Sequence, residues 1–109
     1  MIGVDIEHSD NLPDYYAGDE MRFFEDYFSP EEIVYALNKY NPQKHFTSLF
    51  SLKEAIVKAD NKYKSIKFNQ IIIHFGKMGI PHKDGFLLSV SYSGKMCIST
   101  AIRVDDFPV

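Results

Sequence analysis

The 109-residue chain lacks tryptophan and has a single cysteine, Cys97, which excludes an intramolecular disulfide. A lone thiol in an apolar segment is typically a small buried hydrophobe. No apolar run approaches the roughly 18 residues that a membrane span requires. Asp5 and Glu7 interrupt the apolar stretch near the N-terminus, so no signal peptide is visible. These absences predict a cytoplasmic protein without a membrane partner.

An excess of basic charge is also missing. The chain has 12 Lys and Arg against 15 Asp and Glu, a formal net charge of −3, and no block of Lys or Arg. Because nucleic-acid binding needs a concentrated basic face, no nucleic-acid partner is expected. The histidines have no zinc-ligand spacing with Cys97 or with one another; they are His8, His45, His74 and His82.

Aromatic side chains are abundant, with nine Phe and seven Tyr, and hydrophobic residues make up 45% of the chain. The length suits one domain over residues 1–109, without repeats or linkers. A domain of this size buries only roughly 60–70% of its unfolded surface, so association with copies of itself would stabilise it.

The first half of the chain predicts one strand followed by helices. Residues 2–7 alternate as a strand, which puts the side chains of Asp5 and Glu7 on the same side. Ser29 and Glu32 have the spacing of a capping box at the start of a helix that ends at Asn41-Pro42. Apolar residues at spacings of three and four predict a second helix over about residues 44–60.

The second half predicts an antiparallel sheet. The β-branched residues within 66–75 favour a well-buried strand, and a turn follows at Gly76, Gly79 and Pro81. Two further strands, 86–92 and 96–104, are joined by a hairpin at residues 93–95. The fold class is therefore α+β: a short N-terminal strand, two to three helices, then an antiparallel sheet.

Two charged pairs are candidates for chemistry, and each has an ordinary structural alternative. Asp5 and Glu7 could be the solvent side of an edge strand. Glu54 and Lys58, four residues apart on one helix face, could be a surface ion pair worth a few tenths of a kcal/mol. Neither pair alone defines a site.

Four segments, taken together, carry a resemblance to a known family. Gly3-Val4-Asp5-Ile6-Glu7 resembles a G-[IV]-D-[IV]-E stretch, and Phe28-Ser29-Pro30-Glu31-Glu32 an aromatic F-S-x-x-E segment. The helix from Leu49 to Ala59 is similar to the pattern W-[ST]-x-K-E-[AS]-x-x-K-A. The segment from Ser89 to Gly94 is similar to the strand pattern S-[IV]-[ST]-H-[ST]. In this order the segments resemble the 4'-phosphopantetheinyl transferase superfamily, in its single-domain holo-acyl-carrier-protein synthase type.

The resemblance implies a magnesium-dependent enzyme of fatty acid biosynthesis. Such an enzyme transfers the 4'-phosphopantetheine group of coenzyme A to a serine of an acyl or peptidyl carrier protein. It implies Asp5, Glu7 and Glu54 as metal ligands, a chemically reasonable set because magnesium prefers oxygen ligands. Single-domain members resemble half of a pseudodimeric form, so a homo-oligomer is expected, a trimer as the first guess. Carrier proteins are usually acidic around the modified serine.

The resemblance also assigns roles to individual residues. Glu54 becomes the catalytic base, acting directly or through a bound water, and Lys58 a contact to coenzyme A phosphates. Lys53 is interpreted as either a secondary phosphate contact or a solvated lysine. Ser89, Ser91 and Tyr92 would contact the nucleotide, on a strand that the neighbouring subunit supplies.

Three departures from the family pattern leave an alternative open. Tyr92 stands where the strand segment of the family has a histidine. Leu49 stands in place of an arginine often found before the K-E pair, and Asp60 or Asn61 in place of a glycine common after the K-A pair. Each change removes affinity for an anionic ligand. The chain could therefore be a degenerate, non-catalytic paralogue that serves as a binding or assembly module. Against this stand three acids whose mutual repulsion costs stability unless a cation is present.

Overall fold

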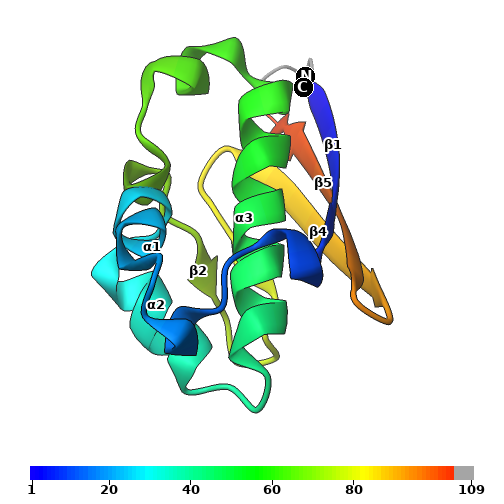
Figure 1. Cartoon of the computed structure of the whole chain (residues 1–109). Coiled ribbons are helices and arrows are strands. Elements are labelled where there is room, and N and C mark those ends of the chain that lie inside the picture. The colour runs from blue at the N-terminus through cyan, green and yellow to red at the C-terminus, as the bar shows by residue number, and fades with distance from the viewer. Residues whose placement is uncertain (105–109) are drawn as a thin grey trace.

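A computed structural model describes residues 1–104 as an α+β fold (Figure 1). In chain order its longer elements are β1 (Ile2–His8), α1 (Met21–Tyr27), α2 (Pro30–Leu37), α3 (Pro42–Ala59), β2 (His74–Phe75), β3 (Pro81–His82), β4 (Phe86–Ser93) and β5 (Met96–Arg103). Short 3-10 turns are η1 (Ser9–Asn11), η2 (Tyr15–Ala17), η3 (Asn61–Ser65) and η4 (Phe68–Gln70). Within residues 1–104, no helix combines the length and apolarity needed to cross a membrane.

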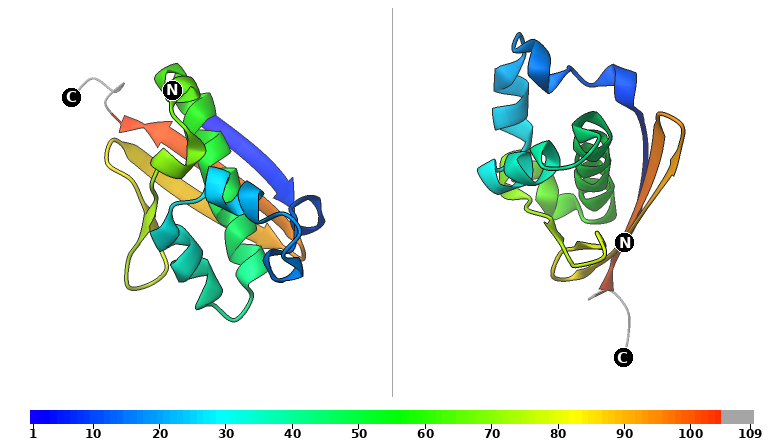
Figure 2. Two further views of the ribbon diagram at one scale, coloured as in Figure 1. Left: turned by 60° about the vertical axis from the view of Figure 1, so that its left-hand side comes forward. Right: turned by 90° about the horizontal axis from the view of Figure 1, so that it is seen from below.

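The main sheet is antiparallel with strand order β1-β5-β4, and α3 lies along one of its faces. Helices α1 and α2 pack on the side of α3 that is away from the sheet (Figure 2). Because α3 is sandwiched between two layers, its buried residues lie on several sides of the helix and include Phe46, Leu49, Leu52 and Ile56.

Local sequence signals place the helix starts. Ser29 and Glu32 form the predicted capping box: the Ser29 amide donates to Glu32 Oε1 at 2.8 Å, and the Glu32 amide donates to Ser29 Oγ at 3.2 Å. Helix α3 begins two residues before the predicted start because Pro42 suits its first turn and Asn41 Oδ1 accepts from the Lys44 amide.

Gly3 permits β1 and α3 to approach closely. A Cβ atom at this position would lie 1.9 Å from the carbonyl oxygen of Ala55 and 2.7 Å from the amide nitrogen of Ala59. Any larger residue would push the strand away from the helix. Gly3 thus fixes the distance between the two elements that carry the candidate acids.

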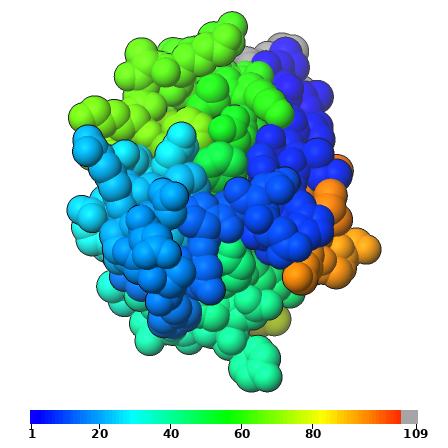
Figure 3. All heavy atoms as spheres, in the orientation of Figure 1, coloured from blue at the N-terminus to red at the C-terminus, as the bar shows by residue number. Residues whose placement is uncertain are grey.

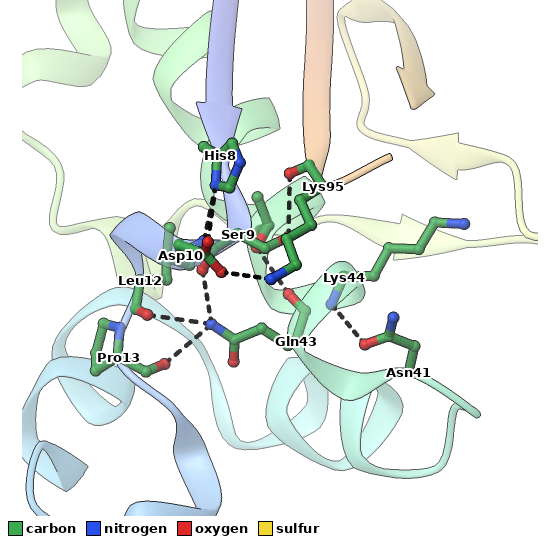
Figure 4. Close-up of polar contacts among 10 residues, drawn as sticks. His8, Ser9, Asp10, Leu12, Pro13, Asn41, Gln43, Lys44 and Lys95 are labelled. Carbon is green, nitrogen blue, oxygen red and sulfur yellow. Dashed lines mark hydrogen bonds and ion pairs between the residues drawn. The ribbon is translucent and has the colours of Figure 1, made fainter. Parts of the chain in front are cut away.

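The first turn of α3 anchors the segment after β1. Gln43 Nε2 donates to the carbonyl oxygens of Ser9, Leu12 and Pro13 at 3.0, 3.1 and 3.3 Å (Figure 4). Lys95, beside the tip of the β4–β5 hairpin, forms an ion pair with Asp10 at 3.1 Å. The anchored segment then crosses in front of α3 towards α1 (Figure 3).

The prediction of a well-buried strand over residues 66–75 is wrong. Residues 68–70 form η4, and only His74–Phe75 pair, with Pro81–His82 in a small separate sheet. Ile71 and Ile73 are buried as expected. The Ile73 amide, however, donates to Glu32 Oε2 at 3.0 Å, so a side chain takes the place of a neighbouring strand.

The face of the main sheet turned away from α3 has no cover from residues 1–104. Its exposed side chains are largely apolar: Ile2, Val4, Ile6, Leu87, Met96 and Ile98. Ser89 and Ser91 lie on this same face, because they pair across the sheet with Thr100 and Ile98.

Candidate active site

The three predicted acids come from two adjacent elements. Asp5 and Glu7 are on β1, two residues apart and on the face that α3 covers, while Glu54 is on α3. The Asp5 side chain is 7% exposed, and Glu7 and Glu54 are half-buried. A chain of contacts fixes the backbone beside Asp5: Ser99 Oγ donates to Ser51 Oγ at 2.7 Å, and Ser51 Oγ donates to the Asp5 carbonyl oxygen at 3.4 Å.

The two carboxylate oxygens of Asp5 have different surroundings. Oδ1 accepts a hydrogen bond from Lys58 Nζ at 3.0 Å, and the same ammonium donates to the Val4 carbonyl oxygen at 3.2 Å. Oδ2 is buried and accepts no hydrogen bond from an N–H or hydroxyl group of residues 1–104. Besides Lys58, the side chain that hydrogen-bonds to Asp5 is the Glu7 carboxyl in its protonated form. An unsatisfied buried acceptor costs about 1–3 kcal/mol, and more when it is charged. The site is therefore short of positive charge.

The pKa values of the other two acids report the same deficit. The pKa of Glu7 is raised from 4.5 to about 7, first by desolvation and then by the hydrogen bond and the charge of Asp5. The pKa of Glu54 is also raised, first by desolvation and then by Asp5. Lys58 opposes both shifts without cancelling them. A second cation would be attracted to this cluster.

The donor chemistry fits magnesium, although the acids are not arranged around a common point. Within residues 1–104, no group of three or more His, Cys, Asp or Glu side chains is placed to hold a metal ion. The unpartnered Oδ2 of Asp5, two neighbouring carboxyl groups and their raised pKa values are nevertheless features that a hard divalent cation would relieve. The metal-ligand assignment stays a prediction.

Lys53 lies in the core, so its interpretation as a solvated lysine or a phosphate contact is wrong. Its side chain is 0% exposed. The ammonium donates to Glu32 Oε1 at 2.6 Å and to the carbonyl oxygens of Tyr27 and Phe68 at 2.8 and 2.7 Å. All three of its donors are thus used inside the protein.

The strand residues predicted to contact the nucleotide do not share a face. Ser89 and Ser91 lie on the uncovered side of the sheet, and Tyr92 lies on the side that α3 covers. Tyr92 is two strands away from Glu7, separated from it by Cys97. Its ring packs under the Lys44 ammonium at 4.2 Å, and its hydroxyl is hydrogen-bonded to Ser48. Within one protomer, these residues and the acids are separate.

A groove beside Tyr92 adds lysines that the sequence reasoning missed. The groove has a volume of about 780 Å³, and the described residues that line it include no acid. Lys39, Lys44 and Lys77 do line it, and no ion pair joins them to a carboxylate within residues 1–104. Desolvation, followed by the charges of Lys39 and Lys44, lowers the pKa of His45 in the same groove. Lys77 is far from Lys39 and Lys44 in the sequence, so no local pattern groups the three lysines.

A second pocket adjoins Glu54. Its volume is about 480 Å³, and it lies between α1, α3 and the segment that contains η3 and η4. Tyr27, Ile66 and Phe68 supply apolar surface, and Lys64 and Lys67 supply positive charge. The run of lysines after α3 could have suggested this basic rim from the sequence.

Comparison with known proteins defines the class. A sequence model described as the 4'-phosphopantetheinyl transferase superfamily matches residues 1–94. The chain is 30% identical over 80 residues to holo-[acyl-carrier-protein] synthase of Thermodesulfovibrio yellowstonii, which covers 73% of this chain and 71% of that protein. The chain belongs to the 4'-phosphopantetheinyl transferase superfamily, which confirms the predicted class of enzyme.

Two further relatives extend this result. The structure of Helicobacter pylori holo-[acyl-carrier-protein] synthase in complex with coenzyme A matches with a TM-score of 0.77 and 25% identity, over 94% of this chain and 98% of that one. The α+β fold prediction is confirmed by this likeness. The fatty acid synthase subunit alpha of Candida parapsilosis is 45% identical over 112 residues, which cover 97% of this chain but 6% of that much longer protein.

Proposed function

We propose that the protein transfers the 4'-phosphopantetheine group of coenzyme A to a serine of an acyl or peptidyl carrier protein, with Mg²⁺ as cofactor. The serine Oγ forms a bond to the phosphorus that bears the pantetheine arm. The bond from that phosphorus to the bridging pyrophosphate oxygen breaks, and adenosine 3',5'-bisphosphate leaves. The observation that carries this proposal is the acid cluster of a superfamily member, in which Asp5 keeps a buried oxygen without a cationic partner.

Asp5, Glu7 and Glu54 would hold the magnesium ion. When bound, the ion neutralises charge on the pyrophosphate, which is the main requirement of phosphoryl-group transfer. The close packing of β1 on α3 at Gly3 holds the backbones that carry these acids in fixed relation. Lys58, one turn after Glu54, extends the positive charge available to the phosphates.

Glu54 is the proposed base that takes the proton from the serine Oγ. It borders the 480 Å³ pocket, through which a carrier serine can reach it. Burial, followed by the charge of Asp5, raises the pKa of Glu54 above its ordinary value, which strengthens it as a proton acceptor. Lys64 and Lys67 on the rim of the pocket would attract the acidic surface of a carrier protein.

The nucleotide half of coenzyme A fits the basic groove of a neighbouring protomer. Lys39, Lys44 and Lys77 supply charge for phosphate oxygens, and Tyr92 supplies an aromatic face. Of the strand residues predicted from the sequence, Ser89 and Tyr92 line this groove and Ser91 does not. Ser89 and Ser91 both belong to the uncovered sheet face, and Ser91 would contribute only through contact between subunits.

The apolar sheet face supports the predicted homo-oligomer, with a trimer as the first guess. Large exposed apolar patches on small domains commonly mark interfaces. Burial of this face against other copies would bring β4 of one protomer towards the acids of another. The active site would then lie between protomers.

The alternative is a non-catalytic binding or assembly module, and two observations favour it. The acids do not converge on a metal position within residues 1–104, and Tyr92 stands where the family has a histidine. Leu49, in contrast, is fully buried in the core. Its replacement of an arginine is therefore not evidence that a contact to an anionic ligand has been lost.

A transfer assay separates the two functions. The protein is incubated with coenzyme A, Mg²⁺ and a panel of apo carrier proteins, and the intact mass of each carrier is measured. We expect one or more carriers to gain a phosphopantetheine group, and Glu54→Ala to slow transfer by roughly 100-fold or more. Glu25→Ala, an exposed acid on α1, is the matched control. A panel of unmodified carriers would favour the non-catalytic module.

A further inference from the structure

Lys58 is the cation that contacts Asp5 in this structure. Its ammonium is 3.0 Å from Asp5 Oδ1 and 3.2 Å from the Val4 carbonyl oxygen. The Asp5 side chain is nearly buried, whereas the Lys58 side chain is 51% exposed. Lys58 lies in the last turn of α3, and its half-exposed side chain reaches Asp5 with its terminal ammonium.

One ammonium ion does not satisfy this cluster. It engages Oδ1 of Asp5 and leaves the buried Oδ2 without a cationic partner. Within residues 1–104, Lys58 pairs with Asp5 and with neither of the two other acids, whose pKa values stay raised. A divalent cation brings twice the charge and can contact several oxygens at once. Such a cation and the Lys58 ammonium would repel each other if both remained against Asp5.

We propose that Lys58 is an exchangeable internal counter-ion. It holds Asp5 while no divalent cation is bound, and it leaves Asp5 when the cation enters. The exposed stem lets the ammonium swing outward without disturbing the core. This inference rests on the proposed function in two places: the divalent-cation site at the acids, and the last step, in which the released ammonium becomes available to a phosphate of coenzyme A.

The exchange predicts an order of events. Cation binding comes first and moves Lys58 outward, and the phosphates then find both positive charges in place. Without the cation, Asp5 would hold the Lys58 ammonium inward, away from the phosphates of coenzyme A. The cation and coenzyme A would therefore bind cooperatively.

Metal affinity measured without coenzyme A tests the exchange directly. We expect Lys58→Met to bind Mn²⁺ or Mg²⁺ on the order of tenfold more tightly than the parent protein in calorimetry, because the competing ammonium is gone. Lys62→Met is the matched control, since it removes an equal charge from a lysine that lies 3.9 Å from Asp60 instead. An affinity of Lys58→Met that is equal to or weaker than that of the parent would overturn the exchange.

A second measurement uses the parent sequence. Lysine amines are labelled with carbon-13 methyl groups, which keep their charge, and the Lys58 signal is assigned by its loss in Lys58→Arg. We expect Mg²⁺ to shift this signal while the Lys62 signal stays in place. A Lys58 signal that does not respond at saturating Mg²⁺ would overturn the exchange.

Neither measurement involves coenzyme A or a carrier protein, so both remain valid if the transfer assay fails. The last step has its own test, a coenzyme A titration at saturating Mg²⁺. Weaker coenzyme A binding by Lys58→Met supports the outward ammonium as a phosphate contact. Unchanged binding removes that contact and leaves the exchange in place.

Discussion

Glu7 connects the acid cluster to the stability of the fold. Its pKa is raised from 4.5 to about 7 by desolvation, then by Asp5. The folded protein consequently binds this proton more tightly than the unfolded chain does. The resulting stabilisation is complete below about pH 4.5 and is lost as the pH rises through about 7.

We therefore expect Glu7→Gln to stabilise the metal-free protein at pH 8 but not at pH 4.5. The gain should be about 1 kcal/mol, well below a full conversion of the pKa shift, because Glu7 is only half-buried and solvent screens its charge. Urea unfolding in the presence of a chelator at both pH values measures the difference. Glu20→Gln, an exposed acid, serves as the control. A gain that is the same at both pH values would show that Glu7 does not titrate with the raised pKa.

At the scale of elements, the Lys53–Glu32 pair joins the helical layer together. Lys53 on α3 reaches the end of α1 through the Tyr27 carbonyl oxygen and η4 through the Phe68 carbonyl oxygen. Glu32 caps the start of α2 and accepts from the Ile73 amide. Four segments thus meet at one buried ion pair, directly beside Glu54 in the sequence.

We expect Lys53→Met to destabilise the protein by about 3 kcal/mol, because it leaves the buried Glu32 carboxylate without its cation. Urea unfolding at pH 7 measures this loss, and Lys67→Met, an exposed lysine, should change stability by less than about 0.5 kcal/mol. The folded fraction of Lys53→Met should retain the coenzyme A affinity of the parent. A weaker affinity with unchanged stability would restore Lys53 as a phosphate contact.

How far the sequence could predict these elements depends on where each backbone and side chain finds its partners. The capping box and α3 are local patterns, and both are present. Residues 66–75 have the composition of a strand, but the Ile73 amide bonds to Glu32, which no local rule can foresee. Lys53 falls between Leu49 and Ile56 on a buried stripe of α3, so helical periodicity alone could have suggested its burial.

For the candidate site, the sequence located the acids but not the lysines around them. Asp5, Glu7 and Glu54 belong to short segments that match the family pattern, so the sequence alone identified them as candidates. Lys77 joins Lys39 and Lys44 only when the β2–β3 hairpin folds against the α2–α3 connection and the first turn of α3. Residues separated by that much chain cannot be grouped without the tertiary structure.

At the scale of the whole molecule, two candidate sites lie on different parts of one protomer. The acids are at the β1 edge of the sheet with α3, and the basic groove is at the β4 edge. The exposed apolar face spans the same sheet. Assembly through that face would allow the groove of one copy to face the acids of the next.

Mixing two inactive variants tests whether one active site uses two protomers. Glu54→Ala keeps its groove but loses the proposed base, and the double variant Lys44→Ala, Tyr92→Ala keeps its acids but loses the groove. In a closed ring assembled at random from equal amounts, about one quarter of the interfaces would combine intact acids with an intact groove. We therefore expect about one quarter of the parent transfer activity after subunit exchange, with each variant alone inactive. Native mass spectrometry confirms that mixed oligomers have formed, and mixed oligomers without activity would place the whole site within one chain.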